Sequence, residues 1–202
     1  MIPRRDELVR SIGAAWRLFL GDPRGMAGFD LSVDGFWRSF GAIIPILPFY
    51  LSVVLVERQI RFGDPASTPE ISEGYFFFVR ALIVAVDWVA LPILLGLFAR
   101  QIGIAQNYAA FIIARNWASV LVVVPDTAVT LLFGLGVVSR EPTAFMSLAV
   151  LLVILRYRYF VTRTALGIGM GFAIAITIAD LLLSVFINVG LDQLLLGWDG
   201  AQ

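Results

Sequence analysis

The sequence predicts an all-α fold, a polytopic transmembrane bundle of five spans with an N-terminal amphipathic interfacial helix. Three observations carry this prediction: the apolar composition, five windows long enough to cross a bilayer, and an uneven distribution of arginines. Hydrophobic residues make up 59% of the 202 residues and charged residues 15%, with a mean hydropathy of +0.88. A soluble domain contains about 45–50% apolar and about 25% charged residues, so this composition excludes a soluble fold.

Five apolar windows are candidate membrane spans. A helix needs about 20 mostly apolar residues to cross roughly 30 Å of hydrocarbon. The windows are about 37–56, 75–98, 108–137, 144–160 and 166–190. The third is long for one straight span, and we expect Pro125 to kink or break it. The chain therefore divides into a cytoplasmic segment 1–36, a five-span bundle 37–190 and a short outside tail 191–202.

The arginines predict the orientation of the spans, because loops rich in Arg and Lys stay in the cytoplasm. With five spans, one side receives the N-terminal segment and the second-to-third and fourth-to-fifth connections, which hold most of the arginines. The other side receives only Arg58, Arg61 and Arg140. We therefore expect a multi-pass protein of the bacterial inner (plasma) membrane, with its N-terminus in the cytoplasm and its C-terminus in the periplasm.

We expect the first 36 residues to form an amphipathic helix and to contain no signal peptide. The apolar stripe of this helix consists of Leu8, Ile12, Ala15, Trp16 and Phe19, at the spacing of one helix face. Arg10 and Arg17 lie off the stripe, where they suit anionic lipid headgroups. Two arrangements fit this pattern: a helix on the membrane surface, and a helix packed on the protein's own spans.

The residue types that the chain lacks exclude most kinds of catalysis known inside membranes. The chain has no Cys and no His, and every basic residue is Arg. Disulfides, Fe–S clusters, haem–His ligation, His-activated nucleophiles and Schiff-base lysines are therefore excluded. The 15 basic and 15 acidic residues cancel, which leaves no basic surface for nucleic acid. We expect no enzyme, no catalytic residues, no cofactor, no metal and no nucleic acid partner.

Polar residues inside the spans form the candidate site. They are Arg80, Asp87, Arg115, Asn116, Asp126 and Asp180. A charged residue at a helix centre costs about 2.5–3.5 kcal/mol, so we expect each one to face the bundle interior and find a partner.

Estimated depths predict how these charges pair. Arg115 is expected to reach Asp87 more easily than Asp180, and Arg80 is expected to pair with Asp126. This leaves one surplus carboxylate, Asp180. The network is either a proton, cation or small-ligand site, or a structural network that sets the register of the helices, and both interpretations stay open.

Small residues recur every four positions at the start of the fifth window, at Gly167, Gly171, Ala175 and Ala179. Such a seam lets two helix backbones approach closely. It predicts either a helix contact inside the bundle or an oligomer interface.

Short motifs along the chain carry a resemblance to a known family. They are Ala15–Phe19 before Asp22-Pro23, Arg115-Asn116-Trp117, Tyr157–Phe160 and Arg163–Leu166. In these motifs the chain resembles bacterial relatives of the Yip family of five-span membrane proteins. The resemblance implies the five-span architecture and a non-enzymatic role in organising membranes or binding partners. The acidic and glycine–tyrosine signatures of the eukaryotic members are absent, so their association with small GTPases is not carried over.

Two functions fit these observations. The first is an integral membrane accessory or scaffold protein that binds membrane lipids, other membrane proteins or further copies of itself through its spans. The alternative is a small transporter or channel that uses Asp87, Arg115 and Asp180 in its interior.

Overall fold

The computed structural model describes residues 4–63 and 71–197, and the regular structure in these ranges is helical. The 3-10 helices are η1 (Pro23–Gly28) and η2 (Phe40–Ala42). The α-helices are α1 (Arg5–Phe19), α2 (Val33–Ser39), α3 (Ile43–Phe62), α4 (Glu73–Phe98), α5 (Tyr108–Gly134), α6 (Arg140–Leu166) and α7 (Met170–Leu196). The last residues of the predicted outside tail, 198–202, lie outside the described ranges.

Five helical segments are long and apolar enough to cross a membrane, which confirms the predicted five-span fold. The first, Val33–Phe62, is a continuous run made of α2, η2 and α3, and the other four are α4 to α7. Helices α6 and α7 extend beyond the ends predicted at 160 and 190. Gly167 and Gly197 end them in the left-handed conformation that glycine adopts without strain, with φ of 66° and 60°.

Helix α5 continues through Pro125 over its full 27 residues, so the proline does not break the third span. A proline removes a single backbone hydrogen bond from a helix, and packed neighbours compensate for that loss in membrane helices. Helix α5 has such neighbours on two sides, because it packs against both α3 and α6.

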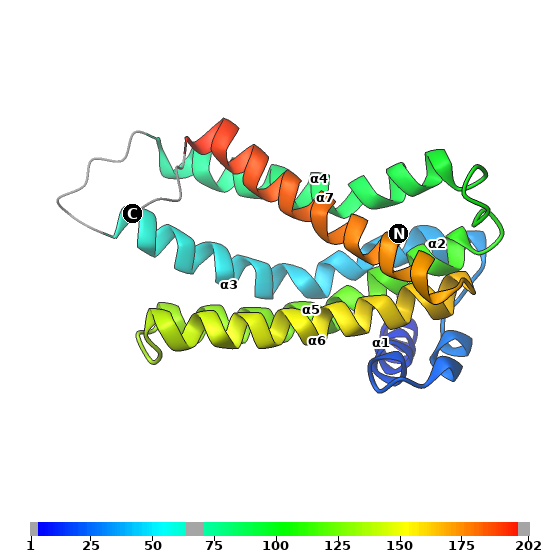
Figure 1. Ribbon diagram of the computed structural model, residues 1–202. Helices are drawn as coiled ribbons and strands as arrows, with labels where there is room; N and C mark the ends of the chain where they lie inside the picture. Colours follow the sequence, from blue (N-terminus) through cyan, green and yellow to red (C-terminus); the bar gives the residue numbers. More distant parts are fainter. Residues whose placement is uncertain (1–3, 64–70, 198–202) are drawn as a thin grey trace.

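The spans are arranged in two layers (Figure 1). Helices α4 and α7 pack on each other in one layer, and α3, α5 and α6 form the other. The start of α5 is the centre of the core, because all residues from Phe111 to Ala118 are buried. The two layers meet mainly where α7 packs on α6, whereas α3 and α4 have few contacts with each other.

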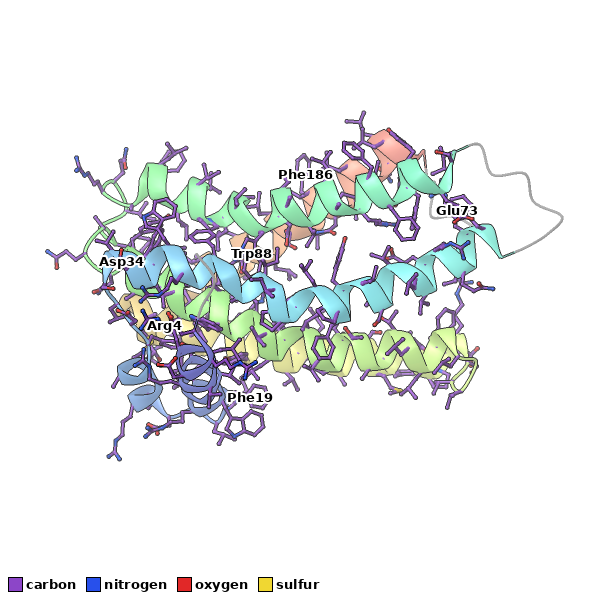
Figure 2. All side chains as sticks on the ribbon, turned by 180° about the vertical axis from the view of Figure 1, so that it is seen from behind. Arg4, Phe19, Asp34, Glu73, Trp88 and Phe186 are labelled. Carbon is purple, nitrogen blue, oxygen red and sulfur yellow. The ribbon has the colours of Figure 1, made fainter. Side chains whose placement is uncertain are left out.

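Helix α1 lies across the ends of α5 and α6, and Figures 1 and 2 show it almost end-on beside the spans. Its buried face consists of Glu7, Ser11, Ala14, Ala15 and Leu18. Tyr157 of α6 donates a hydrogen bond to the carbonyl of Ala15 at 2.9 Å. The helix is therefore packed on the protein's own spans, one of the two predicted arrangements. Val9 and Trp16 stay exposed on another face, where they can contact the headgroup region.

Candidate functional site: two buried ion clusters and a groove

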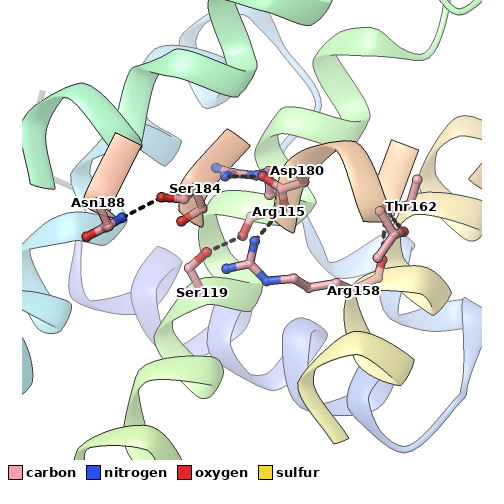
Figure 3. A network of polar contacts seen from close by, with 8 residues as sticks. Arg115, Ser119, Arg158, Thr162, Asp180, Ser184 and Asn188 are labelled. Atoms are coloured by element: carbon pink, nitrogen blue, oxygen red, sulfur yellow. Dashed lines mark hydrogen bonds and ion pairs between the residues drawn. The ribbon is translucent and has the colours of Figure 1, made fainter. Parts of the chain in front are cut away.

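Asp180 of α7 lies between two arginines in the half of the bundle near α1 (Figure 3). One carboxylate oxygen accepts a hydrogen bond from Nη2 of Arg115 on α5 at 2.8 Å. The other accepts from Nη1 of Arg158 on α6 at 2.5 Å. The side chains of Arg115 and Asp180 are 8% and 7% exposed, and that of Arg158 is 26% exposed. We call these three residues the inner cluster; it ties three spans together.

The inner cluster contains more hydrogen-bond donors than acceptors. Nε and Nη1 of Arg115 are buried and have no hydrogen-bond partner within the described part of the chain. The hydroxyls of Ser119 and Thr162, which line the adjoining cavity, donate within their own helices: Ser119 to the carbonyl of Arg115 at 3.0 Å, and Thr162 to that of Arg158 at 2.8 Å. A cavity of about 10 Å³ adjoins the cluster.

A second cluster lies toward the opposite ends of the spans. Arg80 of α4 forms ion pairs with Glu57 of α3 at 2.9 Å and with Asp192 of α7 at 2.8 Å. The phenol of Tyr50 donates to the carbonyl of Arg80 at 2.9 Å. We call Glu57, Arg80 and Asp192 the outer cluster. It links α3 to the layer of α4 and α7.

The observed ion pairs differ from the predicted ones in both halves of the bundle. Arg115 pairs with Asp180 instead of Asp87, and Arg80 does not pair with Asp126. Asp87 is half-buried on α4 and Asp126 is exposed on α5, and neither forms an ion pair with another described residue. The surplus in the inner cluster is therefore a guanidinium, whereas the sequence predicted a surplus carboxylate.

The partners that the sequence analysis missed are Glu57, Arg158 and Asp192, which sit at or beyond the predicted ends of their spans. The predicted windows followed hydropathy, while the helices continue into less apolar sequence. Arg158 lay inside the predicted window 144–160, two residues from its end, and a helix end read from Gly197 would have placed Asp192 inside the fifth span as well. At about 1.5 Å per residue, Arg115, Arg158 and Asp180 then all lie roughly 10–15 Å from the helix ends near α1.

Asn116 belongs to neither ion cluster. Its side chain is fully buried, and its Nδ2 donates to the hydroxyl of Ser39 at 3.0 Å. This hydrogen bond connects α5 to Ser39, the last residue of α2, near the start of the first span. Asn116 therefore supports the packing of the first span on α5.

The predicted small-residue seam lies on an exposed face. Gly167 ends α6, while Gly171, Ala175 and Ala179 are exposed on α7. In the described ranges no neighbouring atom lies within 4 Å of a Cβ placed on Gly171. The seam thus forms no close helix contact with the described residues, and an oligomer interface stays a prediction.

An apolar groove of about 590 Å³ separates α3 from α4. It is lined by Ile44, Leu47, Pro48, Tyr50, Leu51, Val54, Phe77, Arg80, Ala81 and Val84. Tyr50 and Arg80 are its only polar lining residues among those described, and they connect it to the outer cluster. The groove is thus apolar along its length and polar at one place.

Comparison with known protein families, with curated proteins and with solved structures finds no match for this chain. Within residues 4–63 and 71–197, no group of three or more acidic side chains comes together in a way that could hold a metal ion.

Proposed function

We propose that the protein is a non-enzymatic accessory protein of a bacterial inner membrane that holds lipid acyl chains in the groove between α3 and α4. The groove carries this proposal. Its volume of about 590 Å³ lies within the range of about 300–1,000 Å³ that is typical of small-molecule sites. Such sites combine apolar walls with a few polar groups that orient the ligand, as this groove does.

The groove is bordered by side chains that face the bilayer. Leu47 and Leu51 of α3 line it and are about half-exposed, which indicates an opening toward the surrounding lipid. If this groove were empty, the side chains that line it on α3 and α4 would lose van der Waals contacts. Lipid acyl chains are the apolar molecules that surround membrane-spanning helices, so we assign them as the occupant of the groove.

The polar residues of the groove suit an amphipathic ligand. Arg80 lies about 10 Å from the start of α4, near the border of the hydrocarbon region. Beyond it, Arg58 and Glu73 form a bidentate ion pair, with both hydrogen bonds at 2.8 Å, which joins the last turns of α3 to the start of α4. A lipid with its headgroup at this end and its chains along the groove matches both features.

The resemblance to bacterial relatives of the Yip family supports a non-enzymatic role of this kind. We give second place to a transporter that uses Asp87, Arg115 and Asp180. Asp180 already faces two guanidiniums, with which a proton or cation would have to compete, and Asp87 is not part of the inner cluster.

A tryptophan placed in the groove tests the proposal. Ala81→Trp puts a large side chain on the groove wall, and Ala149→Trp makes the same change at an exposed position of α6 outside the groove. After purification in mild detergent, we expect native mass spectrometry to find bound phospholipid on the parent protein and on Ala149→Trp, and much less on Ala81→Trp. Equal lipid retention in all three proteins contradicts the proposal. Loss of a copurifying protein instead of lipid would show that the groove receives a partner's helix.

A further inference from the structure

We propose that the inner cluster binds a small monovalent anion of the halide class beside Arg115. Three independent features of Arg115, Arg158 and Asp180 point to this occupant: an uncompensated positive charge, two buried N–H donors without acceptors, and a cavity of matching size. The site is separate from the lipid groove and does not depend on it.

The first feature is the charge. The cluster holds two guanidiniums and one carboxylate, and Asp180 is the single carboxylate among the residues that line the cavity. Arginine does not lose its proton in proteins, so the cluster cannot become neutral by deprotonation. The buried pair of Arg115 and Asp180 is neutral, so the surplus positive charge belongs to Arg158, whose side chain is 26% exposed; at this partly buried position the charge is less well solvated than in water. One monovalent anion makes the cluster neutral.

The second feature is the set of free donors. Arg115 is more than nine-tenths buried, yet its Nε and Nη1 have no acceptor in the described part of the chain. Leaving a buried donor unsatisfied destabilises the folded state, and more so when the group is charged. Ser119 and Thr162 line the same cavity, but their hydroxyls donate to backbone carbonyls. These two nitrogens lie on different edges of the guanidinium, so an anion in the cavity would accept a hydrogen bond from the one that faces it.

The third feature is size. The cavity measures about 10 Å³, which is enough for roughly one water-sized occupant. Phosphate and sulfate are polyatomic and too large for it, whereas chloride is a single atom only somewhat larger than a water molecule. A water molecule would accept from the same donor and leave the charge uncompensated, so the charge favours the anion. Arg158, one quarter exposed, marks the edge through which an ion enters.

The thermal stability of the purified protein in detergent tests this site. Chloride replaces gluconate at constant ionic strength, and unfolding is followed by circular dichroism. Because a ligand that binds only the folded state stabilises it, we expect Tm to rise by a few degrees with chloride and to saturate. Sulfate in place of chloride is expected to give no saturable rise, since it does not fit the cavity.

Two variants and a control separate the site from general salt effects. Arg158→Gln leaves one guanidinium with one carboxylate, so the dependence of Tm on chloride should disappear. Asp180→Asn leaves two guanidiniums without a carboxylate, so the dependence should become steeper. Arg163→Gln removes an exposed arginine from the same helix and should behave as the parent protein.

Measurements on the parent protein and on the variants can each overturn the proposal. A Tm that responds equally to chloride, gluconate and sulfate would mean that water fills the cavity. A chloride dependence that Arg158→Gln retains in full would place the anion elsewhere. If Arg158→Gln does not fold, the opposite change expected for Asp180→Asn still decides the question.

Discussion

Asp22 holds the junction between α1 and η1 through two kinds of donor. One carboxylate oxygen accepts the backbone N–H of Arg24 at 2.9 Å, and the other accepts Nε and Nη2 of Arg17 at 3.0 and 2.8 Å. The hydrogen bond from Arg24 first, and the one from Arg17 second, lower the pKa of Asp22 below its ordinary value of 3.8. A carboxylate with a lowered pKa stabilises the folded state above its ordinary pKa. That contribution is lost as the pH falls through the lower, folded pKa.

An NMR titration of the Asp22 carboxyl carbon checks this pKa. We expect a midpoint below 3.8 in the folded protein. Arg17→Gln should raise the midpoint only part of the way, because the hydrogen bond from the backbone of Arg24 remains. A midpoint at the ordinary value in the parent protein would disprove the role of these donors.

The buried pair Ser39 and Asn116 gives a second prediction at the level of single residues. Both side chains are fully buried, and Ser39→Ala removes the acceptor of the Asn116 amide while hardly changing the volume. We expect a loss of about 1–2 kcal/mol of unfolding free energy, measured by denaturation in detergent micelles. Ser147→Ala, at an exposed position of α6, is the control and should change it little. Equal stability of the two variants would mean that the hydrogen bond is not formed.

Among the elements, α1 and η1 owe their close packing to glycine. A Cβ at Gly25 would lie 2.6 Å from the carbonyl oxygen of Ala14 and 2.9 Å from Cγ of Leu18. A Cβ at Gly28 would lie 2.8 Å from the Cβ of Ala14. These distances are shorter than van der Waals contact, so the packing requires glycine at both positions.

Gly25→Ala therefore should loosen α1 from the bundle. We expect faster amide hydrogen exchange along α1, because η1 must move away from Ala14 and Leu18. Gly13→Ala is the matched control: nothing lies within 4 Å of its Cβ, and alanine favours a helix over glycine by up to about 1 kcal/mol. Its exchange should be unchanged or slower. Identical exchange in both variants would show that η1 does not hold α1.

At the scale of the whole molecule, α7 connects the two layers. Asp180 joins it to α5 and α6, and Asp192 joins it to Arg80 of α4.

The α4–α5 and α6–α7 connections lie at the same end of the bundle as α1 (Figure 1). Most arginines outside the spans are at this end, so we propose that it faces the cytoplasm.

Single cysteines test this orientation, since the chain has none of its own. We expect Val137→Cys, in the α5–α6 connection, to react with an impermeant maleimide in intact spheroplasts. Gln106→Cys, in the α4–α5 connection, should react only after the membrane is permeabilised. The reverse pattern of labelling would invert the proposed topology.

The sequence alone determined the number of spans, their order along the chain and the segregation of arginines to one end. These follow from local properties, because the length of an apolar run and the position of a charge do not depend on what packs nearby. The choice of Asp180 as a site residue came from the same local argument, since a carboxylate within an apolar helix must find a partner.

Only the tertiary structure decided which charges meet. Partners depend on how each helix is rotated about its axis and tilted against its neighbours, and on where it ends. Arg115 and Arg158 meet Asp180 from three different spans, so no spacing along one helix encodes their contact. For the same reason the stripe of Gly171, Ala175 and Ala179 lies on an exposed face, since helix rotation rather than residue size decides what a face contacts.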